Sequence, residues 1–264
     1  MIRKYVRFRQ NGEVCFGEVR GNEVALLKGC ILENTLEETG KTVQLDSITD
    51  YLPPMDFPNI LCIGANYVDH CKECVAEPPK YPLLFIKSTN ALAAHNTPVA
   101  LPKLYPNEVD YEAELAVIIG KKASYVSEED AMDYVLGYSC ANDISARDVQ
   151  LKMSHQWAFG KSFDNFAPIG PYLVTGIENP EELHVQFHLN GELLQDQPVA
   201  DMIFPIRRLI AHLSAGMPLY PGTVILTGTP AGVGMARDPQ RFLKAGDVAE
   251  VTIGEVGTLR NTIC

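Results

Sequence analysis

The sequence lacks any apolar run long enough to cross a membrane as a helix. Residues 1–7 carry basic side chains but neither the apolar stretch nor the small-residue cleavage site of a secretory signal. Basic residues are also in the minority, since 22 Lys and Arg stand against 33 Asp and Glu, for a net charge of -11. A chain this acidic repels nucleic acid and anionic membranes. We therefore expect an intracellular, cytoplasmic protein with neither nucleic acid nor membrane as a partner.

A second absence is a disulfide framework. The seven cysteines are an odd number spread along a long chain, which is typical of reduced thiols. Cys71 and Cys74 form a CxxC pattern after an expected strand at residues 59–63. A zinc site would need a second Cys/His pair at ligand spacing, and none stands out. We expect two incidental small side chains here, with a redox or zinc role of Cys71 and Cys74 as the alternative.

The sequence does contain enough apolar material for a large core, with 46% hydrophobic residues in 264. Alternating apolar and polar residues at 5–9, 13–19 and 23–27 predict three strands. Asn11-Gly12, between the first two, is a strong signal for a tight hairpin turn. Pro53-Pro54 ends this section and indicates a boundary. We therefore expect a small β-rich N-terminal domain at residues 1–54 and a larger domain at 55–264.

Beyond that boundary, short strands outnumber helices. Asn190-Gly191 predicts a type I′ turn in a hairpin at 185–194, and Ser127 with Asp130 resembles a capping box that opens a helix ending near Gly137. Further expected elements are a buried strand at 83–87, a helix at 206–216, a strand at 223–227 and a closing hairpin at 249–263. Strand and helix do not alternate regularly, so neither a Rossmann nor a TIM architecture is expected. The predicted fold class is mixed α/β, mostly β.

Glu112 and Glu114 stand two residues apart in a run, 111–120, that otherwise has the composition of a buried strand. Alternate side chains of a strand point to one face, so both carboxylates project together, followed on that face by apolar Ala116 and Ile118. Two like charges at the edge of a buried face repel each other and resist desolvation. A divalent cation between them would relieve that repulsion. The alternative is a solvated edge with two glutamates of no special function.

A third carboxylate follows along the chain. Asp143 lies 29 residues beyond Glu114 (143 − 114), across the expected capped helix, and a strand–helix–strand excursion can return it to the pair. Three carboxylates without a His or Cys partner make a hard oxygen site, which favours Mg²⁺, with Mn²⁺ or Ca²⁺ as substitutes, over Zn²⁺ or Cu²⁺. Three protein ligands leave about half of an octahedral shell for water and substrate.

Two further segments carry residues suited to catalysis or binding. If residues 67–73 are helical, His70 and Glu73 share a face, and the carboxylate would orient the imidazole for activating a water. A surface His–Glu pair without function is the alternative. The glycine-rich segment 226–234 follows a strand and lacks the lysine of a P-loop. It is either a tight β turn or a loop that brings backbone N–H groups and the Thr229 hydroxyl to a small anion.

Several of these segments occur in a familiar order and spacing. They are Glu112-Ala113-Glu114, Asp143 with Ala146-Arg147-Asp148, residues 161–164 and residues 227–234. Over residues 59–263 the chain resembles the fumarylacetoacetate hydrolase family, of the short acylpyruvase-like type. The resemblance implies a twisted β-roll with short helices, often preceded by a small β domain, and usually a homodimer. Residues 1–54 would be that small domain and 55–264 the catalytic domain.

The resemblance also implies roles for individual residues. By position they match metal ligands (Glu112, Glu114, Asp143), a catalytic dyad on a lid over the site (His70, Glu73), an active-site lysine (Lys161), and substrate-binding residues (Arg147, Gln150, and Gly228 and Thr229 of the glycine-rich loop).

The expected activity is Mg²⁺-dependent hydrolysis of a carbon–carbon bond in a small 2-oxo acid or dicarboxylic acid, such as an acylpyruvate or fumarylacetoacetate. His70, oriented by Glu73, would deprotonate a water, and pyruvate would leave as an enolate stabilised by the metal, with Arg147 and Lys161 adding positive charge. The same enolate serves decarboxylation of oxaloacetate and isomerisation of 2-hydroxy-dienedioates, so both stay open. Two alternatives from other classes are a non-catalytic metal-binding protein and a redox module built on Cys71 and Cys74.

Overall fold

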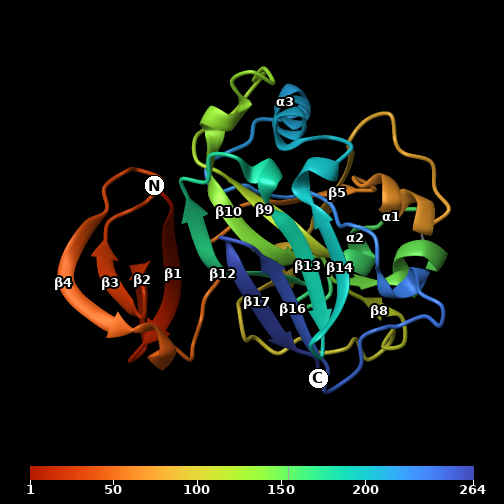
Figure 1. Cartoon of the computed structure of the whole chain (residues 1–264), viewed down its shortest axis with the longest axis horizontal. Coiled ribbons are helices and arrows are strands. Elements are labelled where there is room, and N and C mark those ends of the chain that lie inside the picture. The colour runs from red at the N-terminus through yellow and green to blue at the C-terminus, as the bar shows by residue number, and fades with distance from the viewer. Residues whose placement is uncertain (154) are drawn as a thin grey trace.

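The computed structural model describes residues 1–153 and 155–264 of the chain. Strands dominate the described part, and most of them join either one long sheet or a four-stranded sheet packed against it (Figure 1). The helices are few and short. The expected fold class, mixed α/β and mostly β, is confirmed.

The N-terminal part is a meander of four strands, red to orange in Figure 1. They are β1 (Arg3–Gln10), β2 (Glu13–Arg20), β3 (Glu23–Lys28) and β4 (Glu37–Gln44). Asn11 and Gly12 both have positive φ, 51° and 84°, as the type I′ turn between β1 and β2 requires. The first three strands were expected. β4 was not, because it is exposed along nearly its whole length and carries no alternating apolar pattern.

The meander continues into the long sheet because β1 pairs with β12 (Ala167–Thr175). The order from there is β10 (Val135–Asn142), β9 (Ala113–Ile119), β15 (Val224–Leu226), β5 (Ile60–Gly64) and β6 (Leu83–Lys87), with β7 (Leu92–Ala93) beside β12. β9 and β10 run antiparallel, and every residue of β9 is buried. β6 lies at the sheet edge with Leu83 and Ile86 exposed, so the expectation of a buried strand there is wrong.

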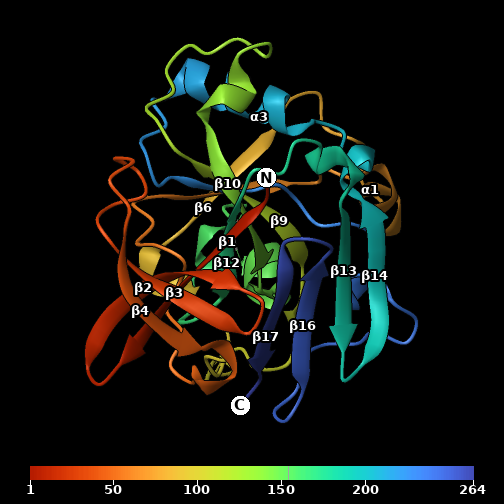
Figure 2. The same ribbon diagram turned by 60° about the vertical axis from the view of Figure 1, so that its left-hand side comes forward.

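A four-stranded antiparallel sheet packs against the long sheet (Figure 2). Its order is β14 (Glu192–Pro198), β13 (His184–Leu189), β16 (Val248–Ile253) and β17 (Gly257–Thr262). Both expected hairpins are confirmed. Phe187 of β13 stacks on Tyr111, just before β9, with ring centroids 4.1 Å apart, and this contact ties the two sheets together. A separate short pair, β8 (Val109–Asp110) with β11 (Ser145–Ala146), flanks the start of β9.

The helices connect strands and cover their ends. They are α1 (Val68–Glu73), α2 (Ala158–Lys161) and α3 (Ile206–Gly216), with a π-helical turn at Val149–Met153 and 3₁₀ turns at Leu45–Ser47, Thr89–Ala91, Ala131–Tyr134, Pro180–Glu182, Val199–Asp201 and Gly234–Ala236. α3 ends at the expected residue and buries the apolar positions that predicted it. None of the helices in the two described ranges has the length and apolarity to span a membrane.

The helix expected between Ser127 and Gly137 is wrong. The Ser127 hydroxyl does accept the Asp130 N–H at 3.2 Å, as in a capping box, but only a 3₁₀ turn follows. Val135 instead begins β10 and pairs with Ile119 of β9. The long-range pairing of a strand with its buried neighbour prevails here over a local helix signal, which is a weak determinant by itself.

Candidate active site

The pairing of β9 with β10 brings the three predicted carboxylates together. Glu112 immediately precedes β9, Glu114 lies in it, and Asp143 immediately follows β10. The Asp143 N–H donates to the Glu112 carbonyl oxygen at 2.8 Å. One carboxylate oxygen of each side chain lies within 4.8 Å of the other two, and the three residues are at most 5% exposed. The expected return of the chain is therefore observed, although it passes through a 3₁₀ turn and not a helix.

The buried charged side chains of the described residues gather around this cluster. They are the carboxylates Asp110, Glu112, Glu114 and Asp143, the cations Lys87, Arg147 and Lys161, and the ring of His70. Burying charges is costly unless they are paired, so such a concentration is maintained for a reason other than stability.

Lys161, at the end of α2, bridges two of the carboxylates. Its Nζ lies 2.7 Å from Glu112 Oε2 and 2.8 Å from Asp143 Oδ2. Arg147 approaches from the other side, with Nη1 2.6 Å from Glu112 Oε1 and Nε 2.9 Å from Asp110 Oδ2. Burial opposes ionisation of Glu112, but Lys161 and Arg147 outweigh it and hold its pKa well below the usual value.

Glu114 is in the opposite situation. Its Oε2 accepts the Gly228 N–H at 2.7 Å, and no cation pairs with it among the described residues. Burial, together with repulsion from Asp143 and Glu112, raises its pKa well above the usual value. Before His70 is counted, four buried carboxylates face three buried cations, so one negative charge is in excess. Glu114 is the carboxylate without a partner, and its raised pKa means that binding a proton relieves this excess.

This donor set fits a hard divalent cation. Glu112, Glu114 and Asp143 offer only carboxylate oxygens, the ligands preferred by Mg²⁺, Mn²⁺ and Ca²⁺. A cation among them would relieve the repulsion that raises the pKa of Glu114. It would also leave the site positively charged overall, which suits an acidic substrate.

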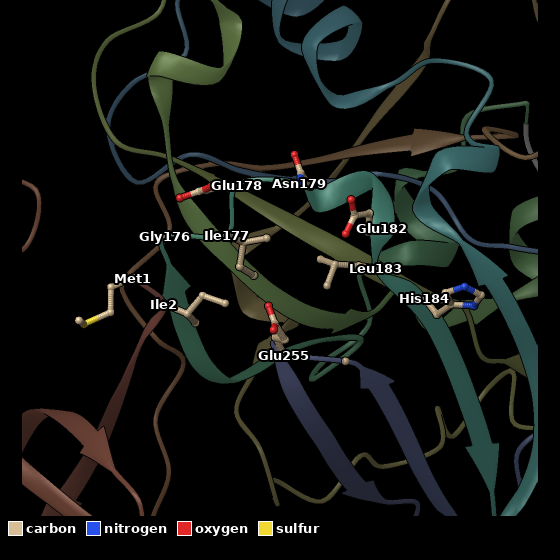
Figure 3. A pocket seen from close by; sticks show the side chains of 11 residues that line it. Met1, Ile2, Gly176, Ile177, Glu178, Asn179, Glu182, Leu183, His184 and Glu255 are labelled. Carbon is tan, nitrogen blue, oxygen red and sulfur yellow. The ribbon is translucent and has the colours of Figure 1, made fainter.

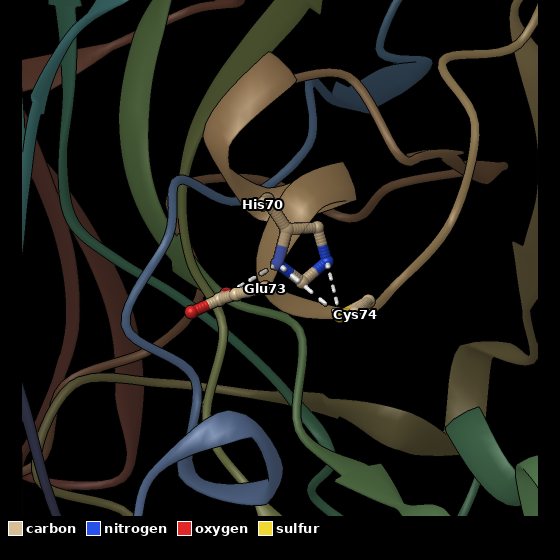
Figure 4. Close-up of side chains that lie close together, drawn as sticks. All are labelled: His70, Glu73 and Cys74. Carbon is tan, nitrogen blue, oxygen red and sulfur yellow. Dashed lines mark hydrogen bonds and ion pairs between the residues drawn. The ribbon is translucent and has the colours of Figure 1, made fainter.

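His70 and Glu73 lie on α1 with their side chains close together, as Figure 4 shows, and His70 lines the same cavity as Glu112 and Glu114. His70 Nδ1 lies 2.7 Å from Glu73 Oε1, while Glu73 Oε2 accepts the Gly232 N–H at 2.7 Å. The carboxylate therefore joins α1 to the glycine-rich loop. Burial lowers the pKa of His70, but hydrogen bonds with Cys74 and Glu73 outweigh it and raise the pKa to about 9.

The glycine-rich loop packs closely on the site. Gly228 has φ 102°, and a Cβ added there would lie 2.6 Å from the Asn66 Cβ, so glycine is required for both reasons. Gln195 of β14 holds the loop, donating from Nε2 to Thr229 Oγ1 and to the Pro230 carbonyl oxygen, both at 2.8 Å. Its Oε1 accepts the Ala113 N–H at 3.0 Å. One buried amide therefore connects the loop to β9.

A cavity of about 230 Å³ opens beside the carboxylates. Seven of the predicted site residues line it: His70, Glu112, Glu114, Arg147, Gln150, Lys161 and Thr229. Glu73, Asp143 and Gly228 do not, but each bonds or adjoins a residue that does. The lining also includes the rings of Phe85 and Trp157, which meet edge to face, with Lys161 Nζ 4.9 Å from the centre of the Phe85 ring. A small molecule with one acidic and one apolar side fits these surroundings.

One donor of Arg147, a residue that lines this cavity, has no partner among the described residues. Arg147 is 3% exposed, and its Nη1 also donates to Gln150 Oε1 at 3.0 Å. Its Nη2 has no hydrogen-bond partner among the residues that the structure describes. A buried guanidinium nitrogen without an acceptor is costly unless a ligand supplies one.

A larger cavity of about 640 Å³ lies elsewhere, between Met1 and Ile2 and the segment that follows β12 (Figure 3). Glu178, Glu182 and Glu255 line it, and none of the predicted site residues does. Size alone would favour this cavity, but the buried charged residues, including Arg147 with its unpartnered Nη2, line the smaller one.

Three residues of the site were not predicted from the sequence. Lys87 ends β6, and its Nζ lies 2.5 Å from Asp143 Oδ1. Asp110 accepts a hydrogen bond from Arg147, and Gln195 donates one to Thr229 of the glycine-rich loop. Asp110 stands two residues before Glu112 and four before Glu114, so in an extended strand its side chain points to the same face. This spacing could have identified it. Lys87 was visible as a charge ending an apolar strand. Gln195 carried no signal, because its partners are distant in sequence.

The chain matches known families along nearly its whole length. Residues 59–264 match the family model described as fumarylacetoacetate (FAA) hydrolase C-terminal, and residues 3–54 match the model described as Rv2993c-like, N-terminal. The chain is 47% identical over 216 residues to the mitochondrial oxaloacetate tautomerase fahd2 of Xenopus laevis, covering 80% of this chain and 67% of that one. It is 46% identical over 214 residues to the oxaloacetate tautomerase YisK of Bacillus subtilis, covering 80% and 71%.

A solved structure agrees with these matches. The 2-hydroxyhepta-2,4-diene-1,7-dioate isomerase from Mycobacterium marinum has a TM-score of 0.87 and 32% identity, over 99% of this chain and 98% of that one. The likeness extends over both the N-terminal meander and the two packed sheets, since nearly all of each chain is aligned. The resemblance found in the sequence is confirmed: the chain belongs to the fumarylacetoacetate hydrolase family.

Proposed function

We propose that this chain is an enzyme that transfers a proton at the carbon next to the 2-oxo group of a small 2-oxo diacid, with keto–enol tautomerisation of oxaloacetate as the leading reaction. The single observation that carries this proposal is a cavity lined by two residues of the carboxylate cluster, His70 and Arg147, where the buried Nη2 of Arg147 has no partner among the described residues. The names of the relatives fahd2 and YisK, both oxaloacetate tautomerases, support the same substrate.

Glu112, Glu114 and Asp143 would hold the cation, for which Mg²⁺ is the proposed identity. When bound, such a cation polarises the 2-oxo group and makes the neighbouring C–H bond more acidic. Lys161 bridges Glu112 and Asp143, and so keeps two of the three carboxylates in place. Its ammonium group also adds positive charge beside the substrate oxygen on which negative charge develops.

Arg147 binds a carboxylate of the substrate through Nη2. Asp110 and Gln150 accept hydrogen bonds from the other side of the same guanidinium, so its orientation is set before the substrate arrives. Thr229 Oγ1 already accepts a hydrogen bond from Gln195, which leaves the hydroxyl proton of Thr229 free to donate to the substrate.

His70 moves the proton. Glu73 occupies Nδ1, which leaves Nε2 for the substrate. With a pKa raised to about 9, the ring is mostly protonated at neutral pH, so Nε2–H donates to the carbon of the enol form. The enol hydroxyl gives up its proton to solvent, and solvent returns a proton to the neutral ring. In the reverse direction the neutral ring takes the proton from the carbon, and the oxygen gains one from solvent. Glu73 stabilises the charged ring between these two steps.

Carbon–carbon bond hydrolysis, the activity first expected from the sequence, becomes the second candidate. It needs a neutral His70 as the base for water, and the raised pKa opposes that at neutral pH. The rings of Phe85 and Trp157 in the lining favour it, because an acylpyruvate has an apolar end. Decarboxylation of oxaloacetate uses the same site.

The homodimer, the cytoplasmic location and the division into domains at 1–54 and 55–264 stay predictions.

The decisive experiment supplies the enol form of oxaloacetate to the Mg²⁺-loaded protein and follows loss of the enol absorbance together with release of pyruvate. Accelerated enol loss without pyruvate is the expected result. Arg147→Lys, which keeps the charge but loses the planar donor, should raise KM about tenfold or more with little change in Mg²⁺ affinity. If the protein cleaved acylpyruvates faster than it consumed the enol of oxaloacetate, and released one pyruvate for each, hydrolysis would replace the tautomerase proposal.

A further inference from the structure

The two cysteines of the CxxC pattern do not act as a pair. Cys71 is 1% exposed and its Sγ lies 3.5 Å from the Ala65 carbonyl oxygen. Cys74 is only partly buried, and its Sγ lies 3.8 Å from Nδ1 and 4.0 Å from Nε2 of His70. Both thiols are free. The relevant partner of Cys74 is therefore the imidazole of His70 and not the thiol of Cys71.

His70, Glu73 and Cys74 form a compact group of ligand atoms at one end of α1 (Figure 4). The three positions are spaced i, i+3 and i+4, so one turn of helix presents them together. One ligand atom from each, a ring nitrogen, a carboxylate oxygen and the sulfur, lies within 4.8 Å of the others. Imidazole, carboxylate and thiolate are the donors of zinc sites, whereas the buried carboxylate cluster offers oxygen alone.

We propose that His70, Glu73 and Cys74 are a second metal site, which takes Zn²⁺ or another thiophilic divalent cation and is separate from the carboxylate cluster. Three protein ligands are the number found in zinc sites that keep one position open. Here the open position faces the cavity, because His70 and Cys74 both line it. Binding displaces the Cys74 thiol proton, and any proton on the liganding ring nitrogen, to solvent.

The site is partly organised in advance. Glu73 is fixed by the Gly232 N–H at 2.7 Å and the Val233 N–H at 3.5 Å, so its carboxylate does not have to be ordered when the metal arrives. The His70 ring is held in turn by Glu73. Only the Cys74 side chain needs to turn towards the ring nitrogen. Mg²⁺ binds thiolate poorly, so it would not compete for this group.

Occupation of this site would stop turnover. Because Glu73 lies beside Nδ1, the shared metal would bind that nitrogen and displace the hydrogen bond with which Glu73 stabilises the charged ring. A metal-bound imidazole no longer gives up and takes back the proton at Nε2, a consequence that rests on the proposed function. The chain would then respond oppositely to two classes of cation: Mg²⁺ in the carboxylate cluster supports activity, and Zn²⁺ on α1 inhibits it.

The site itself is tested with Co²⁺, which gives a near-ultraviolet thiolate-to-metal absorption band when a cysteine binds it. The full chain, saturated with Mg²⁺, is titrated with Co²⁺ as wild type, Cys74→Ser and Cys71→Ser. We expect a band that saturates at one equivalent in wild type and Cys71→Ser and is absent in Cys74→Ser. The absence of a band in wild type, or its persistence in Cys74→Ser, would overturn the proposal.

The inhibitory effect is measured separately, by adding Zn²⁺ to the same three Mg²⁺-loaded proteins during turnover. Loss of an outer partner of a metal site already costs about 10–100-fold in affinity, so loss of the thiolate should weaken inhibition at least tenfold. Cys71→Ser should match wild type. A cobalt band at Cys74 without inhibition by Zn²⁺ would leave the metal site standing and refute the role of His70 in proton transfer. Absence of any turnover would refute the proposed function, and the cobalt titration would still decide the site.

Discussion

Lys87 and Asp143 form an ion pair in the interior of the protein: Nζ lies 2.5 Å from Oδ1, and both side chains are fully buried. Lys161 contacts the other oxygen of the same carboxylate at 2.8 Å. Asp143 is therefore held between two ammonium groups, one from the edge strand β6 and one from α2. The carboxylate is immobilised before any metal binds.

Removing one of these cations tests how much the pair matters. Lys87→Met leaves a buried carboxylate short of a partner, which should lower the free energy of unfolding by about 3–5 kcal/mol. Denaturant titration of the metal-free protein measures this, and Mg²⁺ should restore part of the loss. Lys72→Met is the matched control, because the Lys72–Asp69 pair is solvent-exposed and should not matter. If both substitutions lowered the free energy of unfolding by the same small amount, the ion pair between Lys87 and Asp143 would not be important for stability.

Glu114→Gln should stabilise the metal-free protein and abolish its response to Mg²⁺. Of the buried carboxylates in the described ranges, the substitution removes the one that has no cation partner, and the amide oxygen can still accept the Gly228 N–H. In the wild type, Mg²⁺ at 100 times its dissociation constant should add about 2.7 kcal/mol of stability. Thermal melts with and without Mg²⁺ measure both effects. Exposed Glu77→Gln is the control, and a variant of Glu114 that is still stabilised by Mg²⁺ would exclude it as a ligand.

The same residue sets a pH dependence for the metal-free protein. The pKa of Glu114 is raised in the folded state, so the folded chain binds this proton more tightly than the unfolded chain. Its contribution to stability is therefore largest below the unfolded pKa of about 4.3 and is lost as pH rises through the raised value. The denaturation midpoint of wild type relative to Glu114→Gln should fall from acid to neutral pH. A constant difference between the two proteins would show that the Glu114 pKa is not raised.

The pH profile of turnover distinguishes proton donation by His70 from its action as a base. The raised pKa keeps the ring protonated up to about pH 9. If Nε2–H donates to the enol, kcat/KM for enol-to-keto conversion should fall as pH rises through that value. His70→Asn should lower the rate about 10²–10⁴-fold and abolish the decrease of kcat/KM near pH 9, while Mg²⁺ affinity is kept. A rate that instead rises to pH 9 would identify a neutral imidazole and favour hydrolysis.

Gln195 should act on substrate binding through the glycine-rich loop. Gln195→Leu removes three buried hydrogen bonds that connect Ala113, Thr229 and Pro230, and should cost about 1–3 kcal/mol for each group left unsatisfied. A positioning role predicts a raised KM with kcat less affected, because Thr229 loses its orientation. Gln195→Glu, which keeps only the acceptor, should retain the contact with Ala113 and still raise KM. If KM were unchanged in both variants, Gln195 would contribute to stability alone and would have no role in positioning Thr229.

Local chemistry explains why much of the fold was predictable. Asn11-Gly12 and Asn190-Gly191 take the positive φ values that tight hairpins require, and both hairpins were expected. The apolar spacing of α3 marked its whole length. The failures came where a distant partner decides: Val135 joins β9 instead of a helix, and β4 pairs with β3 with almost no apolar side chains.

By itself, the sequence determined that Glu112 and Glu114 share a face of a buried strand, because side chains alternate along any strand. It also determined that His70 and Glu73 would meet if their segment were helical, because helical spacing brings i and i+3 together. Only the tertiary structure decided which charges neutralise which. Lys87 meets Asp143 across 56 residues, and Arg147 meets Asp110 across 37. It also separated Cys71 from Cys74, because the first thiol turns into the core and the second turns towards His70. Such pairings depend on where sheets and helices pack, and no local pattern records that.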